Sequence, residues 1–197
     1  SGTLQITNTG GTTFANIIGG TRLAQLTING ATTFQDAVQT TLLTTTAAIS
    51  SGTSLDASGA SSIGDNITTT GNQTYTGATT LTADSSLTAG SSTISFGNTV
   101  NGAQSLTFTG SGTVTFTGAV GGTTPLTTIT NAAGQQLTFS DGVAATTIAN
   151  YGTLLFQASS AKTVSAAITD NGTTTIQVIN SADTTISTIT FSGTVVT

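Results

Sequence analysis

Short runs in which apolar and polar residues alternate recur along the whole chain. Typical runs are Leu106–Thr109 and Thr113–Phe116, each with one apolar face and one face of hydroxyl groups. This period of two predicts β-strands. Pairs such as Gly-Gly, Asn-Gly and Asp-Gly separate the runs, and they are typical of tight turns. No segment shows a convincing helical period, so the pattern predicts an all-β chain.

The chain also repeats itself at long range. Residues 4–20 match residues 106–122, with the Gly-Gly pairs in register, and the match continues with small insertions. Self-similarity of this kind is typical of repeat architectures. We therefore predict a single segment, residues 1–197, that holds about two copies of a unit near 100 residues, 1–100 and 101–197.

A unit of this length could be a β-sandwich or several coils of a β-solenoid. A sandwich normally has a compact cluster of large core residues, but this chain has no Trp, eight Phe and two Tyr. Its apolar positions are filled mainly by Ile, Val, Leu and Ala, which stack well on themselves from coil to coil. We therefore expect a parallel β-solenoid of roughly nine or ten coils, about 45 Å long at the spacing of neighbouring strands.

Composition argues against most enzymes and cofactors. The chain has no His, Cys, Glu, Met or Trp, and its only basic residues are Arg22 and Lys162. No side chain therefore titrates near neutral pH, and a Ser or Thr nucleophile would have only Lys162 as an amine base. Zinc, haem and iron–sulfur sites also lack their usual ligands. We expect no enzymatic activity, no catalytic or cofactor-binding residues and no cofactor.

Charge and hydropathy bound the partners in the same way. Two cations cannot neutralise a run of phosphates, so we expect no nucleic-acid binding. No apolar stretch approaches the roughly 20 residues of a membrane helix, so we expect no membrane insertion. Charged residues make up 5% of the chain, whereas threonine alone contributes 51 residues. Stacked coils would bring like charges together, so a low charge suits a solenoid.

Three segments carry a resemblance to a known class of protein. Residues 71–81, 94–106 and 114–126, rich in Gly-Asn, Thr and Gly-Ala, resemble the repeat region of filamentous-haemagglutinin-type and autotransporter-like bacterial surface proteins. The resemblance implies a right-handed parallel β-helix within a very long exported protein, located outside the cell or on its surface. It also implies a role as a stalk, fibre or adhesin.

These observations lead to one functional prediction and two alternatives. We expect a structural segment of an extracellular bacterial fibre, stalk or filament, because both ends of the chain look like uncapped strands. Such a segment would continue into further repeats or associate with itself end to end. The first alternative is an adhesin module that binds a host, cell-surface or glycan receptor. The second is an ice-binding solenoid built on arrays of threonine.

Several residues could form sites, but each has a simpler explanation. Aspartates near turns could bind calcium, yet Asp commonly bonds the local backbone there, so we predict no metal site; they are Asp56, Asp65, Asp84, Asp141 and Asp170. Asp183 precedes two threonines but has no base beside it. Sequons at Asn66, Asn72 and Asn171 leave glycosylation open. We expect Tyr75 and Tyr151 to be stacked core or edge aromatics rather than a sugar platform.

Threonine pairs could form the ice-binding array. They are Thr107/Thr109, Thr113/Thr115 and Thr188/Thr190. A regular array needs one motif in every coil in strict register, whereas these pairs occur irregularly along the sequence. The simpler explanation is that threonine is a good strand former that keeps an uncharged face wet.

Overall fold

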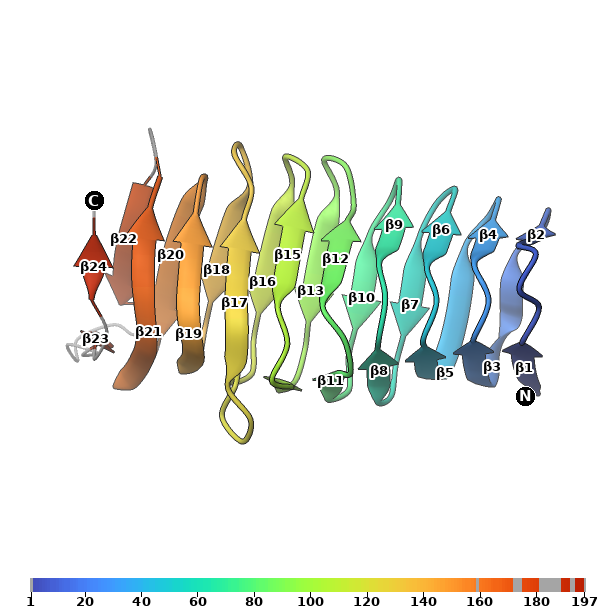
Figure 1. Ribbon diagram of the computed structural model, residues 1–197, viewed down its shortest axis with the longest axis horizontal. Helices are drawn as coiled ribbons and strands as arrows, with labels where there is room; N and C mark the ends of the chain where they lie inside the picture. The colour runs from blue at the N-terminus through green and yellow to red at the C-terminus, as the bar shows by residue number, and fades with distance from the viewer. Residues whose placement is uncertain (1, 159, 172–174, 181–188, 192–193, 197) are drawn as a thin grey trace.

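Three parallel β-sheet sides wind around a single apolar core. The computed structural model describes residues 2–158, 160–171, 175–180, 189–191 and 194–196. Within them every regular element is a β-strand, and every strand pairing is parallel. The chain forms a β-solenoid of about nine turns, as the alternation predicts, with the two ends of the chain at opposite ends of the rod (Figure 1).

Most coils contribute one strand to each side, although the coil of β16 and β17 reaches the second side only through the bridging residue Val120. We call the sides first, second and third in the order in which the chain visits them. The first side contains the amino-terminal parts of β3 (Ile18–Ile28) and β5 (Val38–Thr45), then β7 (Leu55–Ala57), β10 (Gln73–Tyr75), β13 (Thr93–Phe96), β16 (Thr113–Phe116), β18 (Gln136–Phe139), β20 (Thr153–Ala158) and β22 (Thr175–Asn180).

The second side contains β1 (Thr3–Ile6), the carboxy-terminal parts of β3 and β5, then β8 (Ser61–Ile63), β11 (Thr79–Leu81), β14 (Val100–Asn101), the amino-terminal parts of β19 (Val143–Asn150) and β21 (Lys162–Asp170), and β23 (Ile189–Phe191). The third side contains β2 (Thr12–Phe14), β4 (Thr32–Phe34), β6 (Ile49–Ser51), β9 (Ile67–Thr69), β12 (Ser85–Thr88), β15 (Leu106–Thr109), β17 (Leu126–Asn131), the remainder of β19 and β21, and β24 (Val195–Val196).

The coil is right-handed. In Figure 1 the near strands of the third side point upward, the far strands of the first side point downward, and the chain advances from right to left. Parallel strands joined by crossovers almost always wind with this hand, because it matches the twist of the strands. The expected fold class is thus confirmed.

Coil length varies although the register is kept. One turn takes 17 residues between the paired residues Thr32 and Ile49, and 23 residues between Thr113 and Gln136. Loops at the corners absorb the difference. The two matching segments, residues 4–20 and 106–122, therefore occupy different sides of the solenoid. The first segment begins in β1 on the second side, and the other begins in β15 on the third side. The two-copy unit stays a prediction about the sequence.

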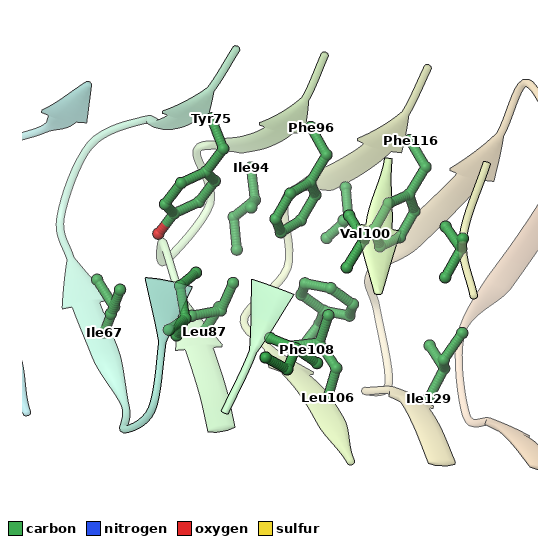
Figure 2. Packing of buried hydrophobic residues seen from close by; sticks show 14 of the residues in the cluster. Ile67, Tyr75, Leu87, Ile94, Phe96, Val100, Leu106, Phe108, Phe116 and Ile129 are labelled. Atoms are coloured by element: carbon green, nitrogen blue, oxygen red, sulfur yellow. The ribbon is translucent and has the colours of Figure 1, made fainter. Parts of the chain in front are cut away.

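Aromatic rings form a continuous stack inside the first side. Tyr75, Phe96, Phe116, Phe139 and Phe156 are paired in register, with ring centroids 5.0, 4.8, 5.1 and 5.5 Å apart. Figure 2 shows the first three rings pointing into the core. The spacing follows from parallel strands, which place equivalent side chains about 4.8 Å apart, and offset stacking adds about 1 kcal/mol to each buried pair.

The third side meets this stack edge-on. The Phe108 ring lies 5.7 Å from Phe116 and 6.2 Å from Phe96, inclined by about 70° to both. Leu87 of the preceding coil points into the core beside it (Figure 2). Stacked and edge-on contacts therefore lock two sides of the solenoid together.

Buried polar side chains form hydrogen bonds mostly with backbone carbonyls near the corners between the sides. The hydroxyls of inward threonines donate to backbone carbonyls two residues away, as from Thr45 to Ala47 and from Thr69 to Gly71. Gln73, fully buried, donates to the Thr88 carbonyl and accepts from the Tyr75 hydroxyl at 2.9 Å. Burial raises the pKa of Tyr75 far above its ordinary value, so Tyr75 stays a neutral donor.

A second buried ladder links three coils. Asn131 donates to the Asn150 side chain at 2.8 Å, and Asn150 donates to Asp170 at 2.7 Å. The ladder begins above Phe108, which pairs with Asn131 and offers no donor. This explains why Oδ1 of Asn131 is buried without a hydrogen-bond partner among the described residues.

Loss of one ring should open a cavity in the aromatic stack. Phe116 contacts rings on both neighbouring coils, so we expect Phe116→Ala to lower the free energy of unfolding by about 3–5 kcal/mol. Tyr151→Ala is the control: this ring is 46% exposed, so its loss should cost well under 1 kcal/mol. Urea unfolding followed by circular dichroism measures both. Equal effects would contradict the stack's role in stability.

Candidate functional site

The aspartates act as local caps and as partners of the two cations. Oδ1 of Asp36 and of Asp65 accepts the backbone N–H of the next residue, in both cases at 2.7 Å. Asp84 reaches across to the next coil, where it accepts the N–H of Ser105 at 2.7 Å. Within the described part of the chain no three acidic side chains cluster as a metal site would require. Asp183 lies outside the described residues.

Arg22 is bound to two coils beyond its own. Its guanidinium lies 2.5 Å from the Asp56 carboxylate, and it also donates to the Thr40 carbonyl at 2.8 Å. The guanidinium thus joins three successive coils at the corner between the first and second sides. Its donors are engaged in this contact, so the structure gives Arg22 a packing role.

Lys162 pairs with Asp141 on the preceding coil. The two charged atoms lie 2.7 Å apart, and the N–H of Gly142 also donates to the carboxylate. Partial burial acts to raise the pKa of Asp141, but the bonds from Lys162 and Gly142 outweigh it and hold the pKa below its ordinary value. With its amine bound to a carboxylate, Lys162 is poorly placed to act as a base.

Shallow grooves follow all three sides, and the charged side chains that line those described are Asp141 and Lys162, which pair with each other beside a groove on the second side. The one on the third side, about 540 Å³, is lined by small and hydroxyl side chains that include Ala31, Ala48, Thr33 and Ser50. A groove on the first side, about 370 Å³, lies beside the exposed Tyr151 ring. Tyr75, by contrast, belongs to the core.

The structure separates the threonine pairs. Thr107 and Thr109 point outward from the third side, and Thr113 and Thr115 point outward from the first. The pair Thr188/Thr190 lies outside the residues whose side chains are described. The pairs therefore do not form one array together, but Thr109 belongs to a longer hydroxyl row on the third side.

That row has one residue in each of six coils. In-register pairing joins each member to the next, giving the row Thr13, Thr33, Ser50, Thr68, Thr88 and Thr109. The sequence conceals it because the intervals between members vary with the length of each coil. Only the register of the strands shows that these residues share one line, which we call the hydroxyl row.

Two of the sequons lie at corners on the surface. Oδ1 of Asn66 accepts the N–H of Ser86 on the next coil at 2.7 Å, and Oδ1 of Asn72 accepts that of Thr93 at 3.1 Å. Both side chains are exposed. Asn171 donates to the Thr169 carbonyl, and its sequon extends outside the described residues. Asn66 and Asn72 thus clamp adjacent coils, a role that sequence reasoning missed.

Comparisons with protein-family models, curated proteins and solved structures give no match. The resemblance to filamentous-haemagglutinin-type repeats therefore stays a prediction. No helix in the described part of the chain is long and apolar enough to cross a membrane.

The pair Lys162–Asp141 should make stability depend on acid pH. Because the folded pKa of Asp141 is lowered, the pair stabilises the fold above the unfolded pKa of about 3.9, and this contribution is lost as the pH falls through the folded pKa. We expect Lys162→Gln to raise the pKa of Asp141 and to cost about 1 kcal/mol or less at neutral pH. Carboxyl NMR titration measures the shift.

Lys162→Arg keeps the positive charge and serves as the control for this titration. It should leave the pKa of Asp141 below its ordinary value. An unchanged pKa in Lys162→Gln would show that Lys162 does not hold it down.

Proposed function

We propose that this chain is a structural segment of an extracellular bacterial fibre, stalk or filament, in which coils continue end to end. One observation supports this proposal most directly. The core-facing side chains stack in rows from coil to coil, and at the last described coil these rows end in exposed apolar residues. Val178 pairs with Phe156 and Val195 pairs with Ile168, yet the two valines are 52% and 43% exposed. They occupy core positions that no further strand of the described residues covers.

The other end of the described solenoid has the complementary edge. There β1 pairs with β3 and β2 pairs with β4, and the described residues offer no strand to their opposite edges. Unpaired edges and uncovered core positions both favour another parallel coil. That coil would come from a continuation of this chain or from a second copy of it.

Charge supports the same proposal. Stacked coils bring outward side chains of neighbouring strands within about 5 Å of each other, where like charges repel. Outward rows of Thr, Ser and Gln avoid this cost, and the two basic residues each meet an aspartate of another coil. The extracellular location rests on two features of the sequence. Residues 71–81, 94–106 and 114–126 resemble repeats of exported bacterial surface proteins, and the absence of cysteine suits a large secreted protein that is stabilised by stacked repeats and not by disulfides.

The test is electron microscopy of the purified chain across a range of concentrations. We expect filaments with a repeat near 4.8 Å along their axis. The double variant Val178→Asp, Val195→Asp places charges on the open core rows and should prevent assembly. Thr117→Asp, Thr127→Asp adds the same charge at exposed corners and should still assemble. Discrete particles of the unmodified chain at every concentration would contradict end-to-end association.

Receptor binding is the second candidate function. It is favoured by Tyr151, whose exposed ring borders the first-side groove together with Gln136 and Thr153. An aromatic ring beside amide and hydroxyl groups suits a sugar. On a glycan array we expect saturable binding that Tyr151→Ala abolishes and that the corner variant Thr76→Ala retains. No binding, or equal binding by both variants, would contradict this function.

A further inference from the structure

The hydroxyl row has no part in end-to-end stacking. Its members point outward, whereas the core positions left exposed at the last described coil, Val178 and Val195, belong to rows that point inward. Thr13, Thr33, Ser50 and Thr68 are exposed, and no described residue makes a hydrogen bond to their hydroxyls. Thr88 and Thr109 continue the row and bond each other. The row thus presents regularly spaced hydroxyls to the solvent.

Small residues beside the row leave it accessible. Two positions earlier in their strands and corners lie Gly11, Ala31 and Ala48, which form the floor of the third-side groove. In the last two coils of the row the equivalent positions are occupied by hydroxyl residues, Ser86 and Thr107, which pair in register. On this side of the row only glycine and alanine lie beside its first three members, whereas the exposed side chain of Asn66 lies beside Thr68 in the fourth coil.

The row contains no ionisable side chain. The carboxylates nearest to it in sequence lie at the corners that flank the third side, Asp65 and Asp84 before it and Asp36 after it, and each accepts a backbone N–H. Threonine is also stiff about χ1, so its hydroxyl and methyl groups stay in place at little entropic cost. A rigid, uncharged and periodic row suits a partner that is itself neutral, rigid and periodic.

We propose that the third side binds ice through the hydroxyl row. Neighbouring members are spaced by the distance between parallel strands, about 4.8 Å, within a few tenths of an ångström of the lattice repeat along the a axis of hexagonal ice. The hydroxyls can take the places of lattice water, and the methyl groups can hold water between them. Each contact is weak, but contacts repeated on one rigid scaffold add together.

The third side is favoured over the other sides by the length of its row, because the outward hydroxyl rows of the first and second sides each span four coils. On the first side the equivalent hydroxyls, Thr74, Ser95, Thr115 and Thr138, span four coils before Leu155 interrupts them. Thr138 is also buried. A single copy of the chain presents the whole row, so this inference does not depend on filament formation.

The test measures thermal hysteresis and inhibition of ice recrystallisation with the unassembled chain. The variant Thr33→Tyr, Thr68→Tyr places two rings on the row and should abolish both activities. The control variant Thr41→Tyr, Thr76→Tyr carries the same rings at exposed corners and should keep them. Both variants should melt at the same temperature as the unmodified chain, because all four positions point outward.

Three results would overturn the inference. The first is a folded, unmodified chain with no thermal hysteresis. The second is full activity in the Thr33→Tyr, Thr68→Tyr variant. The third is binding to microcrystalline cellulose, lost in that variant, without any effect on ice, which would assign the row to a crystalline polysaccharide.

Discussion

The whole structure depends on the in-register stacking of parallel strands. Each side chain lies above its equivalent in the preceding coil. A residue type that interacts well with a copy of itself therefore stabilises every pair of neighbouring coils in which it recurs. Five aromatic rings stack inside the first side for this reason, and the buried asparagines Asn131 and Asn150 form a ladder on the third. The same stacking would repeat the repulsion between like charges in every coil. This explains why the chain has few charged residues and pairs its two cations with aspartates.

Corners decide how much the sequence can vary without loss of register. Close approach of neighbouring coils restricts some of them to glycine: a Cβ at Gly77 would lie 2.3 Å from the backbone carbon of Gly59. Elsewhere the corner grows, as between Val120 and β17, where a loop is held by Asn101 of the preceding coil, whose Oδ1 accepts the N–H groups of Thr123 and Thr124. The chain thus changes the length of a coil while the strands stay aligned.

Alternation and composition were enough to predict the strands and the solenoid, because each strand reads directly as one apolar and one hydroxyl face. The buried polar residues were not predictable in the same way. Gln73 and Asn150 belong to residue types that are normally exposed, and their burial depends on partners in other coils. The hydroxyl row could not be recognised in the sequence for a related reason, because coils of unequal length place its members at irregular intervals.

Inward and outward rows are chemically independent because successive side chains of a strand point to opposite faces. The inward rows carry the apolar contacts that hold the coils together. The members of the hydroxyl row in its first four coils are exposed, and their hydroxyls make no hydrogen bond to any described residue. Substitutions along the outward row therefore change the surface of the rod with little effect on its core. A solenoid can in this way keep one structural role for its inside while each of its three sides acquires a separate binding role.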